Sequence, residues 1–127
     1  MNTTRQALQD GIGAALQGGR IGDISHAVET AGRCAGYGIP DGYGGHGVGT
    51  AMHEDPPVPN IGRPHRGMRL REGLVLAIEP MFCEGGGDGQ RTLADGWSIA
   101  TADGSRAAHF EHTMAITPDG PVVLTAP

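Results

Sequence analysis

Residues 74–81 read LVLAIEPM and form the clearest strand pattern in this 127-residue chain. Side chains alternate across a strand, so the two leucines and Ile78 share one face, and Val75, Ala77 and Glu79 share the other. A carboxylate on an otherwise apolar face is costly to bury unless it is paired or bound to a metal. Because Pro80 follows at once, this residue alone favours a strand end at which Glu79 reaches water.

Two helices are predicted on the N-terminal side of this strand. Thr4 to Leu16 and Ile24 to Ala35 both place apolar residues at helical spacing. Gly18 and Gly19 end the first helix, and Asp23 is the predicted N-cap of the second. The short glycine-containing turn between the helices predicts an antiparallel helical hairpin.

Strand and loop signals fill the remainder of the chain. A short strand is expected around Gly45 to Val48, and the prolines at 56, 57 and 59 predict an extended loop. Cys83 to Ala94 is expected to be a loop. Trp97 to Thr101 and Ala107 to Ile116 are predicted to pair as a hairpin. A final strand is expected at residues 122–124.

Helices followed by mostly antiparallel strands predict an α+β fold, with residues 1–127 forming one domain. The chain contains no Lys and has a net charge of -5, so we expect no nucleic-acid partner. The longest apolar run, Leu74 to Ile78, is far too short to span a membrane. Two cysteines and the absence of a signal-peptide pattern indicate the cytoplasm.

Four residues are candidates for chemistry. His46 and His53 lie in GGHGVGTAMHEDP (residues 44–56), Glu79 lies in the strand described above, and Glu111 lies in HFEHT (residues 109–113). His109, Glu111 and Thr113 share one strand face, which is compatible with a solvated polar stripe. Two histidines near two strand-borne carboxylates favour a metal site for Mn, Fe, Co, Zn or Ni instead.

Other motifs are excluded or weak. His53 and Glu54 begin like a helical zinc-protease motif, but Pro57 stands where the second histidine belongs. Gly42, Gly44 and Gly47 match the dinucleotide fingerprint without the strand before it and the helix after it that the fingerprint needs.

Nearly the whole chain resembles the type I methionine aminopeptidases. The resemblance rests on GHGVGTAMHEDPPVPN (residues 45–60), LAIEPMF (76–82) and DGWSIATADGSRAAHFEHTMAIT (95–117), taken in order. It implies the C-terminal half of the pita-bread fold and the removal of N-terminal methionine from new proteins. Trp97 in its DGW setting favours this branch over the proline aminopeptidases and creatinase-like hydrolases that share the fold.

The resemblance also implies a role for each candidate residue. His46 and Glu79 correspond to ligands of one metal ion, Glu111 to a bridge between two ions, and Glu79 also to the group that activates water. His53 corresponds to a residue that contacts the substrate near the scissile carbonyl. Met52 and Trp97 correspond to positions that line the methionine pocket, although an aromatic residue is expected where Met52 stands.

The family's two aspartate ligands come from an N-terminal half that has no counterpart in this sequence. We therefore expect a truncated and impaired enzyme that binds at most one metal ion well. Candidate partners are peptides that begin with methionine, the ribosome, and either a separate N-terminal half or a second copy of the chain. The alternatives are a non-catalytic binding module and a proline-specific or creatinase-like relative.

Overall fold

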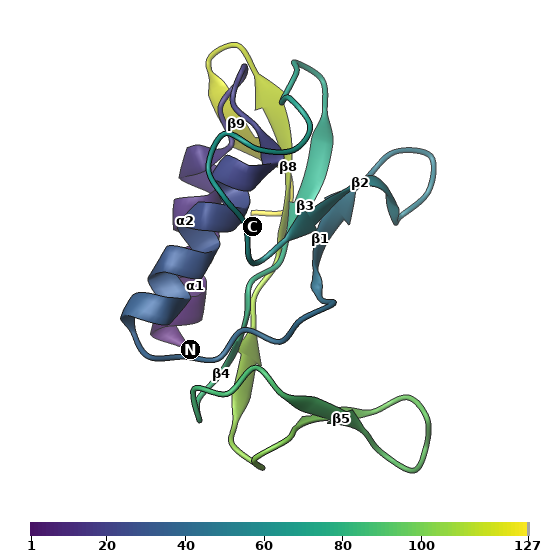
Figure 1. The fold of residues 1–127 in the computed structure, drawn as a ribbon. Helices are drawn as coiled ribbons and strands as arrows, with labels where there is room; N and C mark the ends of the chain where they lie inside the picture. Colours follow the sequence, from purple (N-terminus) through teal and green to yellow (C-terminus); the bar gives the residue numbers. More distant parts are fainter. Residues whose placement is uncertain (127) are drawn as a thin grey trace.

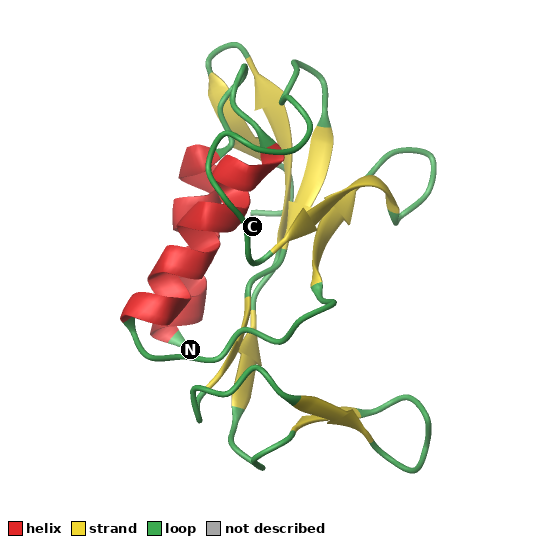
Figure 2. Cartoon of the chain, in the orientation of Figure 1, coloured by secondary structure: helices red, strands yellow, loops and turns green. Residues whose placement is uncertain are grey.

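The computed structural model describes residues 1–126 and contains two helices against an antiparallel sheet (Figure 1). Helices α1 (Asn2–Ala14) and α2 (Ile21–Cys34) form an antiparallel hairpin on one side of the sheet (Figure 2). The sheet has the strand order β2-β1-β3-β8-β9. Its strands are β1 (Gly44–Gly47), β2 (Glu54–Pro59), β3 (Val75–Ile78), β8 (His112–Thr117) and β9 (Gly120–Val123). The predicted α+β class is confirmed.

Two small strand pairs extend from the main sheet. Strand β4 (Met81–Cys83) pairs with β7 (Ala107–His109), and β5 (Gln90–Thr92) pairs with β6 (Ile99–Thr101). The predicted hairpin between residues 97–101 and 107–116 is therefore wrong. Strand β6 instead pairs with β5, which lies earlier in the chain, in a segment that was expected to be a loop. Strand β7 pairs with β4, and β8 pairs with β3. Residues 110 and 111 interrupt the long strand that was predicted there.

The core lies between the helices and the sheet. Leu8, Ile24 and Val28 from the helices meet Leu76 and other side chains of the sheet, and all of them are almost fully buried. Burying an aliphatic side chain of this size contributes roughly 1.5–3 kcal/mol of transfer free energy. The helical hairpin therefore holds the central strand β3 in place through its apolar face.

Helix α2 starts earlier than the sequence predicts. It begins at Ile21, and Asp23 is its third residue rather than its N-cap. The Asp23 carboxylate still satisfies backbone donors at this end, because it accepts hydrogen bonds from Arg20 N–H (2.7 Å) and His65 N–H (2.7 Å). The acidic side chain does lie at the start of the helix, but the helix begins three residues before the predicted Ile24.

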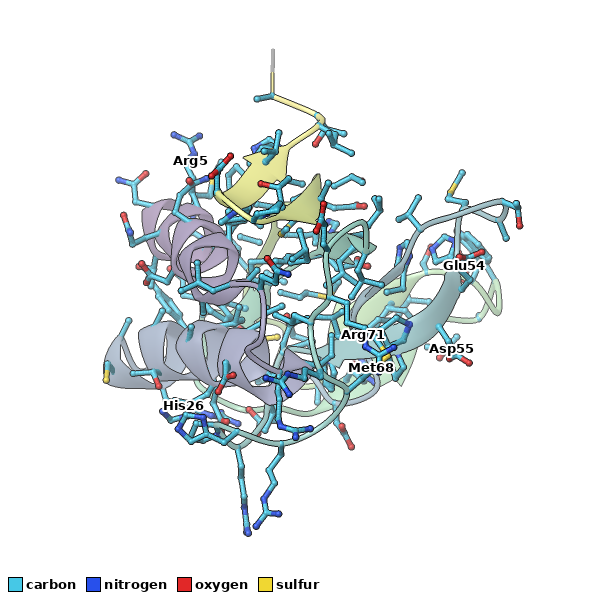
Figure 3. All side chains as sticks on the ribbon, turned by 90° about the horizontal axis from the view of Figure 1, so that it is seen from above. Arg5, His26, Glu54, Asp55, Met68 and Arg71 are labelled. Atoms are coloured by element: carbon cyan, nitrogen blue, oxygen red, sulfur yellow. The ribbon has the colours of Figure 1, made fainter. Side chains whose placement is uncertain are left out.

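The proline-rich segment is an edge strand rather than a loop. Strand β2 lies at one end of the sheet order, and within residues 1–126 its partner strand is β1 alone. Proline is tolerated at an edge because one side of the strand needs no backbone donor. Glu54 and Asp55, at the start of β2, lie on the side of the molecule away from the helices (Figure 3). No helix among residues 1–126 is both long and apolar enough to cross a membrane.

Candidate metal centre

The strand register places the candidate residues on one face of the sheet. Ile78 pairs with His112 and Met81 pairs with His109, so the same register sets Glu79 opposite Glu111. Directly opposed residues point to the same face of an antiparallel pair. On the other side of β3, His46 pairs with Ala77, two positions before Glu79. The topology therefore brings together residues that are far apart in sequence.

A break in the strand pair makes room at Glu79. Pro80 has no backbone N–H, and β3 ends at Ile78 while β4 resumes at Met81. The Glu79 carbonyl accepts a hydrogen bond from Asn60 Nδ2 at 3.0 Å. Asn60 is only 3% exposed, so a buried side chain stabilises the backbone at the interruption between β3 and β4.

Glycines on both sides of His46 allow β1 to approach its neighbours. A Cβ atom on Gly45 would overlap the carbonyl oxygen of Ala77, and a Cβ atom on Gly47 would overlap that of Asp55. The backbone of β1 is therefore held tightly between β3 and β2, which restricts where the His46 ring can lie.

Three donor side chains converge on one position. His46, Glu79 and Glu111 each offer a ligand atom, and these atoms lie within 4.8 Å of one another. His46 Nε2 lies 3.6 Å from Glu79 Oε1, and both side chains are largely buried. Glu111 is the exposed member. The structure thus places these three predicted residues together, and their role as metal ligands stays a prediction.

The other ring nitrogen of His46 faces a backbone acceptor, which favours one tautomer. His46 Nδ1 lies 2.8 Å from the carbonyl oxygen of Gly47, which can only accept a hydrogen bond. Nδ1 of the neutral imidazole therefore carries the hydrogen, and Nε2 presents its lone pair to the Glu79 carboxylate. Two acceptors that face each other need a cation or a proton between them. Imidazole nitrogen with carboxylate oxygen fits a divalent metal ion.

The electrostatics of Glu79 follow from the same arrangement. Burial raises the pKa of the Glu79 carboxyl, and the neighbouring Glu111 carboxylate raises it further. His109 and His46 act in the opposite direction. The Glu111 carboxylate therefore disfavours the charged form of Glu79 unless a cation lies nearby.

The three residues predicted to contact the substrate, His53, Met52 and Trp97, lie on exposed parts of the chain. The ring of His53 lies 4.0 Å from that of His46 between centroids, on the exposed turn that leads into β2. Met52 and Trp97 are 76% and 87% exposed. These two residues do not enclose a pocket within the described part of the chain.

Two residues at the centre were not assigned by the sequence analysis. His109 Nε2 lies 3.3 Å from Glu79 Oε2. Its alternation with Glu111 was visible in the sequence, but its partner was not. Asn60 carried no sequence signal, because its contact with Glu79 depends on how β2 enters the sheet.

The comparisons with known proteins agree with the geometry. The profile of metallopeptidase family M24 matches residues 1–118. Methionine aminopeptidase 1 of Mycobacterium tuberculosis is 52% identical over 128 residues, which is 96% of this chain and 48% of that protein. Methionine aminopeptidase 1 of Bacillus subtilis is 45% identical, over 98% of this chain and 50% of that protein.

Solved structures show the same relationship. The methionine aminopeptidase of Thermotoga maritima superposes with a TM-score of 0.95 at 44% identity, over 99% of this chain and 50% of that one. The prolidase of Pyrococcus horikoshii shares the fold, with a TM-score of 0.73 at 24% identity over 98% of this chain and 30% of that one. The chain thus spans about half the length of the methionine aminopeptidases it matches.

Proposed function

Because the chain belongs to metallopeptidase family M24, we propose that it forms part of a metal-dependent aminopeptidase that removes N-terminal methionine from proteins. The names of its relatives from Mycobacterium tuberculosis and Bacillus subtilis support this substrate class. The natural substrates would be new polypeptides, which makes the cytoplasm and the ribosome the proposed setting.

The observation that carries this proposal is the pair of acceptors at the centre. His46 Nε2 and Glu79 Oε1 face each other across 3.6 Å, with a Glu111 oxygen close by. We propose that these three residues hold one divalent cation. A second ion would depend on donors beyond this set. When bound, such a metal lowers the pKa of a water molecule and polarises a carbonyl group.

The chain's own residues would supply the remaining chemistry. Glu79 is the proposed acceptor of a proton from the attacking water, because its carboxylate lies at the centre and is partly desolvated. His53 is proposed to donate a hydrogen bond to the carbonyl oxygen of the scissile bond as negative charge develops there. Met52 and Trp97 are proposed to contact the methionine side chain.

The test is methionine release from a Met-Ala-Ser peptide by the purified chain with added Mn²⁺. We expect Glu79→Gln to lower the rate by about 10²-fold or more, because it removes a proton acceptor. An Ala-Pro-Ala peptide is the matched substrate control. Release from Ala-Pro-Ala alone, or an unchanged rate in Glu79→Gln, would contradict the proposal. A folded chain that binds Mn²⁺ and releases nothing would favour the non-catalytic binding module.

A further inference from the structure

We propose that His109 is a positioning residue that holds Glu79 in the orientation needed for metal binding. The inference rests on the proposed metal centre and concerns a side chain outside its predicted ligand set. His109 would donate a hydrogen bond from Nε2 to Oε2 of Glu79, and so leave Oε1 directed at the metal position.

The two oxygens of Glu79 have different neighbours. Oε1 faces His46 Nε2 at 3.6 Å, whereas Oε2 faces His109 Nε2 at 3.3 Å. Each oxygen of the carboxylate therefore lies near a different imidazole, and only His109 is available as a donor to it. A carboxylate held at only one oxygen is free to rotate about its last side-chain torsion, and a second contact limits that freedom.

His109 is separate from the group of converging donors. Among residues 1–126, the group whose ligand atoms lie within 4.8 Å of one another comprises His46, Glu79 and Glu111, without His109. Hydrogen bonds from outside the ligand set orient metal ligands in many sites, and losing one typically weakens metal binding about 10- to 100-fold. The position of His109 therefore fits orientation of Glu79 better than direct ligation.

Strand pairing fixes the backbone position of His109 next to Glu79. His109 pairs with Met81 at one end of the β4–β7 strand pair. The residue after Met81 in β4 is Phe82, which is buried in the core. The same register puts His109 and Glu79 on one face. Its side chain is 41% exposed, so water can partly replace the contact when the imidazole is removed.

The experiment measures Co²⁺ affinity by calorimetry and the Co²⁺ absorption spectrum for the wild-type chain and four variants. His109→Ala is expected to bind Co²⁺ about 10- to 100-fold more weakly, with the shape of the spectrum unchanged because the ligands are the same. His109→Gln retains a side-chain N–H donor and is expected to restore most of the affinity. His46→Ala removes a ligand and is expected to lose both the affinity and the spectrum.

His112→Ala is the matched control. His112 lies three residues along the chain on the other strand face, and its Nδ1 lies 2.9 Å from Thr125 Oγ1. It should bind Co²⁺ like the wild type. Unchanged affinity in His109→Ala would overturn the positioning role. A changed spectrum without rescue by glutamine would also overturn it and make His109 a ligand. A wild-type chain that binds no Co²⁺ would instead refute the metal centre, and the inference with it.

Discussion

At the scale of single residues, Asp88 connects the glycine-rich loop at residues 85–89 to helix α2 through Arg33. Its carboxylate accepts two hydrogen bonds from the Arg33 guanidinium, at 2.6 and 2.7 Å, and one from Ile39 N–H at 2.8 Å. The hydrogen bonds from Arg33 are the main reason that the pKa of Asp88 lies below its ordinary value. A lowered carboxyl pKa adds stability above the unfolded-state pKa and loses it as the pH falls through the folded-state pKa.

The contribution of Asp88 should therefore be complete at pH 7 and begin to fall near about pH 4, the ordinary pKa of an aspartate. It is lost as the pH drops further, through the lower pKa that Asp88 has in the folded state. Asp88→Asn should lower the free energy of unfolding by about 1 kcal/mol at pH 7, since the pair is partly exposed and screened by solvent. Urea unfolding at pH 7 and pH 3 would measure this difference. Asp119→Asn, in an exposed turn, is the control. An equal loss at both pH values for Asp88→Asn would contradict the mechanism.

The sequence predicted the main residues of the candidate centre for a physical reason. His46 lies among glycines and Glu79 lies on an otherwise apolar strand face, whereas Glu111 shares an alternating polar stripe with His109 and is set apart by the family resemblance. His109 belongs to an alternating polar stripe that is usual on a solvated strand, so its contact with Glu79 became visible only through the register of two distant strands. A sequence reports which side chains share a face, but not which side chains they meet.

At the scale of elements, the approach of β1 to β3 depends on glycine. Gly45→Ala would put a Cβ atom onto the carbonyl oxygen of Ala77, where the backbone of β3 leaves no space. We expect a loss of stability of about 1–3 kcal/mol or more. Gly13→Ala, near the end of α1, is the matched control, because nothing lies within 4 Å of its Cβ position. That change should stabilise the chain by about 0.5–1 kcal/mol.

Urea denaturation would measure the free energy of unfolding of Gly45→Ala and Gly13→Ala against the wild type. Gly45→Ala should also weaken Co²⁺ binding, because it displaces the strand that carries His46. A Gly45→Ala chain as stable as the wild type would mean that β1 can move away from β3 at little cost.

Strand pairing was the least predictable property of the elements. Helix periodicity is local, so both helices were found with errors only at their ends. The partners of β6 and β7 are set by contacts across the sheet, and the nearest turn signal therefore suggested the wrong hairpin. The prolines of β2 suggested a loop because a strand accepts proline mainly at the edge of a sheet. Whether a strand lies at the edge is known only once the strand order of the sheet is known.

At the scale of the whole molecule, the proposed metal centre links three distant parts of the chain. His46, Glu79 and Glu111 come from β1, the β3–β4 break and the β7–β8 break, so a bound cation would add a link between strands that already meet through backbone pairing and the core. A ligand that binds only the folded state stabilises it by mass action, by about 2.7 kcal/mol at 100 times its dissociation constant. For a chain of this size, that corresponds to a rise in Tm on the order of 10 °C.

Thermal unfolding with Mn²⁺ and with a chelator would measure the rise in Tm at pH 7.5 and at pH 5. We expect the rise to shrink at pH 5, because carboxylate and imidazole ligands bind metal in their deprotonated forms. Glu111→Gln should reduce the rise without lowering the Tm measured in the chelator, since Glu111 is exposed and contributes little to the core. An equal rise in His46→Ala would show that Mn²⁺ stabilises the fold elsewhere, and the convergence of these three side chains would then need another explanation.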